Sequence, residues 1–418
     1  MIVAVLLWLA TAWLCLHWAT DTPLFLLMAP SCILWLRFKA LTGFLQSTSD
    51  NPLLQAYQMP AAAVKAVFQR TLYFCLSSLT VHEFLWMLDE ILYPDYRRVS
   101  LENSVFVVAS VRCGSTSLHR ALSLDKERFV SPRFIELFWP FICVQKFLDW
   151  LELRDERLGT TVIKNLEAKF QAQLGPDVMA RHPMHWHEAE EDDVLLASTH
   201  LVGWYLAAAF PHPEVWVQSG HVHRLPQSAQ QRSFVLYERA LQKILYRRGN
   251  GHHLLTKSHL ISLVPTIADK IPGAKIVGMV RHPADAFVSL YGLTEASYKS
   301  LSPAEDYDPK ALVAGHVRFW QEFTRSEMSF LKNKHMVVTL NDYVQDQDKV
   351  VHKLYDAWGY PIRGTEFEKR LEADRTKHKA YKAKANYKNP TLEELGLERK
   401  LFDEMFAEYL TTFGIVSN

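Results

Sequence analysis

Three short runs of apolar residues stand out along the chain, at residues 105–109, 275–280 and 336–340. Each run ends at a polar turn and is short enough to be a buried β-strand. After the first two runs, apolar residues return at helical spacing, around positions 118–122 and 286–291. This repeated strand–turn–helix pattern predicts a three-layer α/β fold built around a parallel sheet of four or five strands.

The segments around these strands are predicted to be mainly helical. Residues 146–174 and 233–246 carry apolar side chains at helical spacing. Upstream, residues 61–69 and 71–92 predict two amphipathic helices. These helices would either cover the main domain or lie on a membrane surface.

The N-terminus predicts a membrane anchor. The first 36 residues contain no Lys or Arg, and their single acidic residue is Asp21. Spanning a bilayer takes roughly 20 apolar residues. One tilted helix, two short helices or a cleaved signal peptide fit this pattern, and a buried core helix is the alternative. We therefore divide the chain into a hydrophobic anchor (1–40), a helical stem or cover (41–98) and a main domain (99–418).

The turn after residues 105–109 carries the first candidate chemistry. A turn that feeds a helix offers free backbone N–H groups and the positive end of the helix dipole, which together attract anions. The candidate anion-binding residues are Arg112, Cys113, Gly114, Ser115, Thr116 and Ser117. A Walker A motif has its Lys after the last Gly, so this order disfavours a kinase or ATPase. An ordinary turn with a polar cap is the alternative.

A second turn, after residues 275–280, is similar. Arg281 follows the strand, Pro283 suits the first turn of a helix, and Asp285 favours the positive end of that helix. Ser289 follows Arg281 by eight residues, two turns into the helix. Arg281 and Ser289 could therefore reach one phosphate group.

Together the two turns resemble the nucleotide signatures of sulfotransferases that use 3′-phosphoadenosine 5′-phosphosulfate (PAPS). Residues 112–116 are similar to the family's 5′-phosphosulfate loop, and Arg281 and Ser289 have the spacing of its 3′-phosphate segment. Residues 254–259 (LLTKSH) resemble the Lys-Thr-His strand end of the cytosolic members. The likeness runs from about residue 99 to the C-terminus and is closest to the membrane-associated branch. Ala109, Cys113 and Ser115 depart from the family's usual residues but keep the turn and a hydroxyl.

The resemblance implies sulfuryl transfer from PAPS as co-substrate, without a metal, on a sheet with a P-loop-like phosphosulfate-binding loop. In that scheme Arg112, Ser115 and Thr116 hold the sulfuryl group and the 5′-phosphate. Arg281 and Ser289 hold the 3′-phosphate, and Lys257 stabilises the bridging oxygen.

Two residues compete for the role of catalytic base. His259 matches the position of the base in cytosolic sulfotransferases, and imidazole suits proton abstraction at neutral pH. Glu136 lies 24 residues after Arg112 in an apolar run, and several membrane-bound and lumenal sulfotransferases use a Glu at a similar distance. A structural ion pair with Arg112 or Arg133 is the alternative for Glu136. A side chain that only contacts the acceptor is the alternative for His259. We predict that His259 is the base.

Composition adds few further limits. The 418 residues are 49% hydrophobic and 22% charged, and the net charge of +1 gives no reason to expect a nucleic-acid partner. Five cysteines do not make a disulfide framework. The acidic run at 188–193 is interpreted as charge that favours a helix N-terminus. Histidines gather at 182–187 without an H-E-x-x-H motif, and no metal site is predicted.

The acceptor and the location stay open at this stage. The apolar N-terminus and an aromatic content of 12% favour a lipid, sterol or other amphiphile, with glycans as alternatives. The chain is expected at a membrane, either of the Golgi or ER or of the bacterial inner membrane. The positive-inside rule favours a cytoplasmic main domain, whereas a Golgi-type sulfotransferase would face the lumen. The rival function is a membrane-anchored, non-catalytic nucleotide-binding protein on a sulfotransferase scaffold.

Overall fold

The computed structural model describes residues 80–193, 195, 227–301, 308–382 and 388–416. The chain forms two units, Met1–Tyr93 and Pro94–Asn418, and helix α4 (Thr80–Leu92) is the described helix of the first. The predicted anchor at 1–40, and the stem as far as residue 79, lie outside the described residues. Among the helices that the structure describes, none is long and apolar enough to span a bilayer.

The second unit is built on a parallel sheet of five strands in the order β2-β3-β1-β4-β5. Strand β1 (Val105–Ala109) is central, and all five of its residues are buried. It pairs in parallel with β3 (His253–Ser258) on one side and with β4 (Lys275–Val280) on the other. The edge strands are β2 (Phe129–Val130) and β5 (Met336–Thr339). The prediction of a parallel α/β sheet is therefore confirmed.

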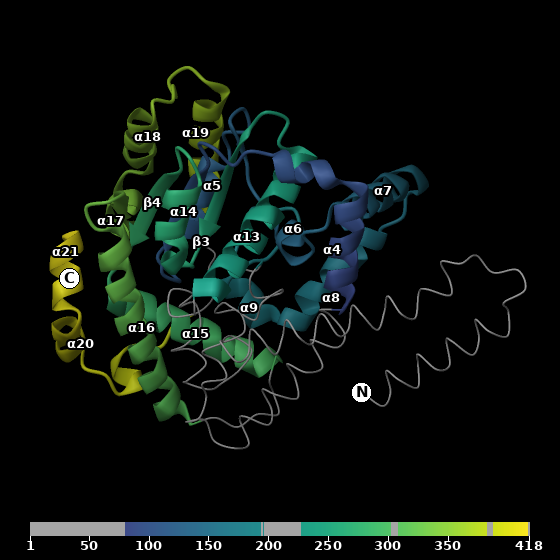
Figure 1. The fold of residues 1–418 in the computed structure, drawn as a ribbon. Helices are drawn as coiled ribbons and strands as arrows, with labels where there is room; N and C mark the ends of the chain where they lie inside the picture. The colour runs from purple at the N-terminus through teal and green to yellow at the C-terminus, as the bar shows by residue number, and fades with distance from the viewer. Residues whose placement is uncertain (1–79, 194, 196–226, 302–307, 383–387, 417–418) are drawn as a thin grey trace, which may run out of the picture. The chain divides into compact units, whose positions relative to one another are not determined.

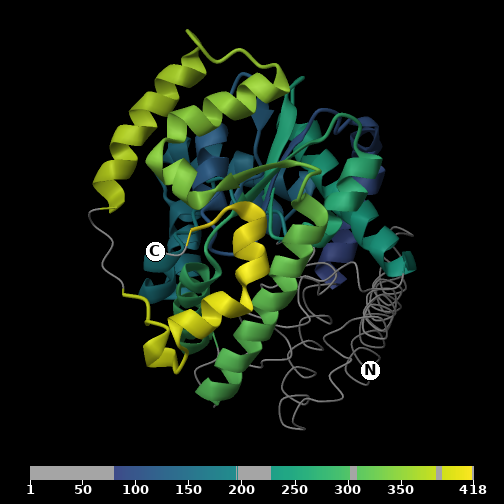
Figure 2. The ribbon, with the colours of Figure 1, turned by 90° about the vertical axis from the view of Figure 1, so that its left-hand side faces the viewer.

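Helices connect the strands and cover the sheet, because parallel strands need long crossovers. Figure 2 shows helices on both sides of the strands. Among the residues that the structure describes, the helices of this unit are α5 (Ser115–Leu122), α6 (Phe134–Phe138), α7 (Ile142–Leu158), α8 (Val162–Leu174), α9 (Pro176–Arg181), α13 (Gln227–Arg248), α14 (Val264–Lys270), α15 (Pro283–Leu301), α16 (Pro309–Leu331), α17 (Leu340–Gln345), α18 (Gln347–Trp358), α19 (Glu366–Lys382), α20 (Arg399–Met405) and α21 (Ala407–Phe413). Short 3₁₀ turns occur at η2 (Pro94–Arg98), η4 (Ile261–Leu263) and η5 (Glu393–Leu395).

The helical segment predicted at 146–174 is divided in two. Helix α7 ends at Leu158, and the next residue, Gly159, has a left-handed φ of 63° that closes the helix. Asp155 then accepts hydrogen bonds from the Thr160 hydroxyl (2.5 Å) and from the backbone N–H of Ile163 (2.9 Å), which joins the end of α7 to the start of α8. A glycine in the left-handed region thus divides the predicted helical segment into two helices that pack against each other.

The arrangement of the strands determines where a site can form. In a parallel sheet all strands end at the same edge, and ligands bind beyond their carboxyl ends. Strands β1, β3 and β4 are neighbours in the sheet, of which Figure 1 labels β3 and β4, so the segments that follow Ala109, Ser258 and Val280 emerge side by side. These are the segments that carry the predicted chemistry.

Candidate active site

The loop between β1 and α5 is shaped by two left-handed backbone positions. Arg112 has a φ of 64° and Gly114 a φ of 87°. A Cβ atom at Gly114 would also lie 2.5 Å from Leu340 Cδ1 and 3.2 Å from Met279 Cε. Only glycine fits this position without strain. Helix α5 begins immediately afterwards, and the N–H groups of its first turn lack partners within the helix.

A buried carboxyl group holds this loop from behind. The backbone N–H of Ser110 donates to the carboxylate of Glu327 in α16 (2.8 Å), and the hydroxyl of Tyr409 in α21 donates to the other oxygen (2.7 Å). Burial raises the pKa of Glu327 to about 7. The loop is thereby tied to two helices that lie far from it in the sequence.

The two predicted nucleotide segments are bonded to each other. The Arg281 guanidinium donates through Nη1 to the backbone carbonyl of Arg112 (2.9 Å). The Arg112 side chain in turn donates through Nε to the Ser289 hydroxyl (2.9 Å), across 177 residues of sequence. Arg112, Arg281 and Ser289 therefore form one hydrogen-bonded chain at the ends of β1 and β4.

A cavity of about 590 Å³ opens beside this chain. Four guanidinium groups line it, and four guanidinium groups at one cavity suit a ligand with several anionic groups. The lining also includes the predicted loop residues Gly114, Ser115, Thr116 and Ser117 together with His182, Glu191 and His259; the four arginines are Arg112, Arg120, Arg181 and Arg281.

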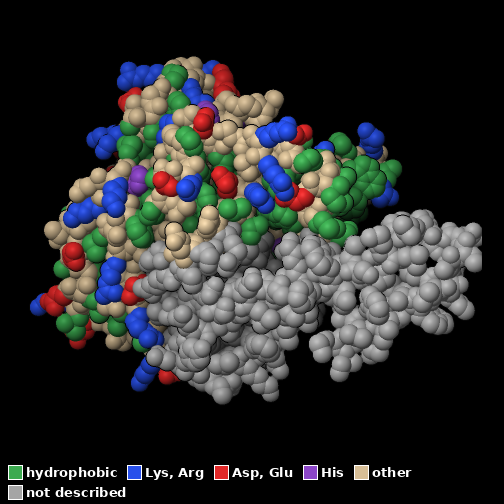
Figure 3. All heavy atoms as spheres, viewed as in Figure 1, with side chains coloured by type: hydrophobic (Ala, Val, Ile, Leu, Met, Phe, Trp, Pro, Cys, Tyr) green, Lys and Arg blue, Asp and Glu red, His purple; other side chains and the backbone are tan. Residues whose placement is uncertain are grey.

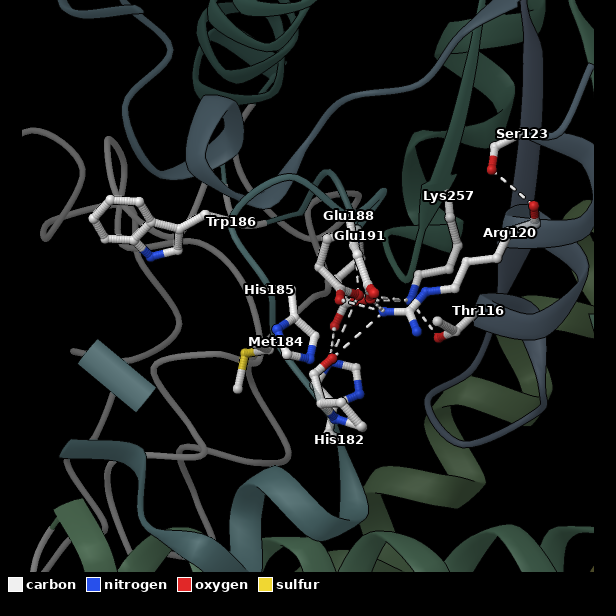
Figure 4. Close-up of polar contacts among 12 residues, drawn as sticks. Thr116, Arg120, Ser123, His182, Met184, His185, Trp186, Glu188, Glu191 and Lys257 are labelled. Carbon is white, nitrogen blue, oxygen red and sulfur yellow. Dashed lines mark hydrogen bonds and ion pairs between the residues drawn. The ribbon is translucent and has the colours of Figure 1, made fainter. Parts of the chain in front are cut away.

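Lys257 lies at the end of β3, fully buried, at the centre of a polar cluster. Its ammonium donates to the Thr116 hydroxyl (2.8 Å) and forms ion pairs with Glu191 and, at 3.5 Å, with Glu190. Figure 4 shows Lys257, Thr116 and Glu191 pointing toward one another. Burial by itself would lower the pKa of Lys257, but the two carboxyl groups outweigh it and hold that pKa above its usual value. Lys257 is therefore a cation fixed behind the loop.

Glu190 and Glu191 form a coupled pair of carboxyl groups. Burial and the neighbouring Glu191 charge raise the pKa of Glu190 well above its usual range. The pKa of Glu191 is held well below its usual range, because Lys257 and His182 outweigh the cost of its burial. Two adjacent carboxyl groups cannot both ionise readily. The pair therefore carries one negative charge, which lies on Glu191.

His259 follows β3 at the wall of the cavity. Its Nδ1 lies 2.8 Å from the backbone carbonyl oxygen of Ala109. A carbonyl can only accept, so Nδ1 carries the proton and the neutral ring has its lone pair on Nε2. Burial and the nearby Lys257 charge lower the pKa of His259 to about 3. The ring is neutral at physiological pH, with the tautomer that a general base needs.

Comparison with known proteins assigns this arrangement to a family. The model of the sulfotransferase family matches residues 104–364, which is more than half of the chain. This chain belongs to the sulfotransferase family. The match covers the loop at Arg112, the strand end at Lys257 and His259, and the segment from Arg281 to Ser289. No curated protein matches the chain by sequence.

Solved structures agree on the fold. The sulfotransferase STF1 from Mycobacterium tuberculosis H37Rv is similar with a TM-score of 0.59 and 16% identity, over 89% of this chain and 92% of that one. The sulfotransferase STF9 from Mycobacterium avium is similar with a TM-score of 0.62 and 16% identity, over 82% of this chain and 86% of that one. The family prediction is confirmed, while the membrane-associated branch stays a prediction.

The structure does not bring Glu136, the second candidate for the base, to the cavity. Glu136 is buried in α6 and pairs with Arg247 and with Arg248, whose Nε and Nη2 each lie 2.7 Å from its oxygens. It also accepts the backbone N–H of Arg133 (2.9 Å). The ion-pair interpretation therefore describes Glu136, although with partners in α13 rather than with the side chain of Arg112 or Arg133.

Two other predicted residues take indirect positions. The Cys113 side chain is fully buried, and burial raises the pKa of its thiol well above the usual range. Only the backbone of Cys113 can face a ligand of the loop. Ser289 is also buried and reaches the cavity through Arg112.

The acidic run differs from its predicted role. Glu190–Asp193 are buried rather than solvated at a helix start, and the backbone N–H of Asp192 donates to the Lys257 carbonyl (2.8 Å). Asp192 also accepts hydrogen bonds from Tyr237 (2.5 Å) and Thr256 (2.7 Å). The sequence did carry a signal for burial, because four consecutive acidic residues are more than a solvated helix N-terminus requires.

His182, Glu190 and Glu191 have donor atoms within 4.8 Å of one another, close enough to hold a metal ion. The Lys257 ammonium already lies against both carboxyl groups. A divalent cation would have to displace that ammonium from a fully buried position, at a large electrostatic cost. The donor set therefore fits the Lys257 ammonium better than a metal ion.

Sequence reasoning missed Arg181, which ends α9. Its guanidinium donates to the Asn389 side chain (2.5 Å) and to the Lys388 carbonyl (3.0 Å), and its own carbonyl accepts from Arg112 (3.3 Å). Arg181 lines the cavity and joins the loop to the C-terminal part of the chain. No local motif surrounds it, so only the tertiary contacts reveal it.

Proposed function

We propose that this chain transfers the sulfuryl group of PAPS to a hydroxyl, or less often an amine, of a lipid, sterol, glycan or other small acceptor. The observation that carries the proposal is the bonded chain Arg281–Arg112–Ser289 at the cavity. The family assigns these three side chains to two different phosphates of one nucleotide. In this chain the three residues already lie within one hydrogen-bonded unit. One nucleotide with two phosphate groups could therefore contact all of them.

The donor site follows from the cations around the cavity. Arg112, Ser115 and Thr116 would hold the sulfuryl group and the 5′-phosphate, together with the first N–H groups of α5. Arg281 and Ser289 would hold the 3′-phosphate. Charge stabilisation of this kind needs fixed cations and dipoles rather than a metal. Lys257 supplies such a cation, because its buried ion pairs hold the ammonium in place.

The transfer itself needs a base and a stabilised leaving group. The acceptor oxygen would attack sulfur while the bond from sulfur to the bridging phosphate oxygen breaks, which releases adenosine 3′,5′-bisphosphate. His259 Nε2 would take the proton of the acceptor hydroxyl, and Lys257 would stabilise the charge on the bridging oxygen. An anionic donor close to His259 would raise the pKa of its imidazole toward neutrality.

The donor assignment is tested by ligand-dependent melting of the full-length chain. Adenosine 3′,5′-bisphosphate should raise the melting temperature far more than AMP or ATP with magnesium, because binding at a hundredfold excess over Kd stabilises by about 2.7 kcal/mol. Arg281→Ala should remove this discrimination. Arg325→Ala, at an exposed arginine of α16, should leave it intact. Equal shifts with AMP and with the bisphosphate would contradict the assignment.

Catalysis is tested by incubation with labelled PAPS and fractionated lipid, glycan and small-molecule pools. His259→Ala should lower turnover by roughly 10² to 10⁴ while donor binding survives. Glu136→Gln should leave the turnover of folded protein near that of the parent chain. Donor binding without label transfer to any pool would favour the non-catalytic nucleotide-binding alternative instead.

The membrane location is proposed from the sequence of residues 1–40. Buried apolar area does not respond to ionic strength, so the full-length chain should stay with membranes through high-salt and carbonate washes. Protease protection of the C-terminus in sealed vesicles would establish the side of the membrane. Release of the full-length chain by salt alone would exclude a spanning segment.

A further inference from the structure

Helix α15 carries a glycine in its interior, at a position where any side chain would collide with an arginine of α9. A Cβ atom at Gly292 would lie 2.8 Å from Nη1 of Arg181 and 3.0 Å from Oδ1 of Asn389. The two helices pack against each other, as can be followed in Figure 1. Glycine is a weaker helix former than alanine, but here it gives the guanidinium room against the helix backbone. Gly292 therefore makes a place for the Arg181 guanidinium on α15.

This place lies one helical turn beyond Ser289. Ser289 and Gly292 are three residues apart in α15, so they share a face of the helix and lie about 4.5 Å apart along its axis. The Ser289 hydroxyl accepts a hydrogen bond from Nε of Arg112 (2.9 Å). Both Nη atoms of Arg112 donate to the backbone carbonyl of Arg181 (3.3 Å each). The guanidinium groups of Arg112 and Arg181 therefore lie beside consecutive turns of one helix.

The hydrogen bonds of Arg181 hold its guanidinium without neutralising it. Arg181 lines the cavity together with Arg112 and Arg281. Its guanidinium donates to the Asn389 side chain (2.5 Å) and to the Lys388 carbonyl (3.0 Å), and both of these oxygens are uncharged. On the face of the molecule that Figure 3 shows, Lys and Arg side chains are scattered among acidic, apolar and uncharged groups. The gathering of guanidinium groups at the cavity is therefore a local feature.

The acidic groups that line the cavity belong to other elements. Glu191 forms an ion pair with Lys257. Asp346 caps α18 by accepting the backbone N–H of Lys349 (2.9 Å), and Asp348 lies in the first turn of the same helix, where the helix dipole favours a carboxylate. None of these three acids belongs to α9 or α15, the helices that hold the arginine and its glycine.

We propose that Arg181 binds the 3′-phosphate of the donor nucleotide, beside Arg281 and Ser289. The inference rests on the proposed sulfotransferase function, which places the 3′-phosphate at Ser289. A phosphate monoester carries nearly two negative charges and three acceptor oxygens, and an arginine fork binds two such oxygens at once. The sulfuryl group and the 5′-phosphate belong instead to the loop at 112–116. Arg181 thus distinguishes nucleotides that carry a 3′-phosphate from those that lack it.

The test is calorimetric binding of adenosine 3′,5′-bisphosphate and of AMP to the full-length chain and its variants. Arg181→Ala removes the guanidinium but keeps the carbonyl that Arg112 uses. It should weaken binding of the bisphosphate about 10- to 100-fold, the range for hydrogen bonds to charged groups, and leave AMP binding nearly unchanged. Arg181→Lys keeps the charge without the fork, so its loss should be smaller.

Gly292→Ala tests the same place from the side of the helix. The added Cβ displaces the far end of the Arg181 side chain, while alanine favours the helix. This variant should stay folded and lose affinity for the bisphosphate but not for AMP. Asn389→Ala is the matched control, because it removes a partner of Arg181 but no charge, and it should keep most of the discrimination. Circular dichroism without ligand reports whether each variant is folded.

Two results would overturn the proposal while leaving the donor assignment intact. One is a parent chain and an Arg181→Ala variant that prefer the bisphosphate over AMP to the same degree. The other is an equal loss in Asn389→Ala and Arg181→Ala, which would mean that Arg181 only holds residues 388 and 389 in place. A parent chain that binds AMP as tightly as the bisphosphate would overturn the donor assignment itself, and this inference with it.

Discussion

Glu190 and Glu191 are neighbours of the same residue type, yet the structure assigns them different protonation states beside Lys257. Glu191 is the ionised partner of the Lys257 ammonium, and Glu190, 3.5 Å from the same ammonium, is held neutral by burial and by Glu191. The same substitution, Glu to Gln, should therefore have different effects at the two positions. This difference tests the charge distribution of the whole cluster.

The expected magnitudes follow from which charge each substitution removes. Glu190→Gln replaces a neutral acid by a neutral amide of the same shape, so it should cost less than about 1 kcal/mol of unfolding free energy. Glu191→Gln removes the ionised partner but also the charge that keeps Glu190 neutral. Glu190 can then ionise and face Lys257, which limits the cost to about 1–2 kcal/mol.

The double substitution removes both carboxyl groups that form ion pairs with the Lys257 ammonium. It leaves the fully buried Lys257 with neither glutamate charge, and breaking a buried ion pair in this way costs about 3–5 kcal/mol. The cost of the double variant should thus exceed the sum of the two single costs by about 1–2 kcal/mol, a coupling typical of groups in direct contact. Glu188→Gln provides the control, since Glu188 is half-exposed and its pair with Arg120 at 2.9 Å is near the surface.

Urea titration of the full-length chain and its variants at neutral pH measures these free energies, with tryptophan fluorescence as the signal. The reasoning fails if the single costs add up to the double cost within about 0.5 kcal/mol, the range found for independent sites. It also fails if Glu190→Gln costs more than Glu191→Gln, because the charge would then lie on the wrong carboxyl group.

Three further outcomes are expected. Burial raises the pKa of Glu327 to about 7 from an ordinary 4.5, so the contribution of this group to stability is complete below pH 4.5 and is lost as the pH rises through 7. Glu327→Gln mimics the neutral acid, and its unfolding free energy should rise relative to that of the parent chain by about 3 kcal/mol between pH 4.5 and 8 in urea titrations. A difference that stays constant with pH would refute this. Glu136→Gln should lower the unfolding free energy by about 3 kcal/mol, because Arg247 and Arg248 lose their buried partner. The donor-dependent melting shift should persist in this variant. Loss of that shift in folded protein would mean that Glu136 contributes to the donor site. Gly114→Ala should weaken the binding of adenosine 3′,5′-bisphosphate at least tenfold in calorimetry, because the φ of 87° at Gly114 and the contact with Leu340 leave no room for a Cβ atom. An unchanged affinity would mean that the loop does not hold the nucleotide.

The sequence by itself determined the parts of this protein that depend on local patterns. Apolar runs ending in polar turns predicted strands β1, β4 and β5, because burial of a strand is recorded in consecutive side chains. Gly114 after Arg112, and Ser289 two helical turns after Arg281, predicted two anion-binding turns. The residues of each signal lie at most eight positions apart in the sequence, and over such short spacings backbone geometry determines which side chains share a face.

The tertiary structure decided which of these groups meet. Arg112 reaches Ser289 across 177 residues, and Glu136 reaches Arg248 across 112, so one predicted site residue joined the donor segment and another became a structural ion pair. Glu191 became the counter-ion of Lys257 because residues 190–193 pass along the end of β3. Spacing in the sequence cannot encode such pairs, since the position of one element relative to another follows from the packing of the whole sheet and its helices. The protonation states of Glu190, Glu191 and His259 follow from the same packing, because burial and neighbouring charge, rather than residue type, set their pKa values.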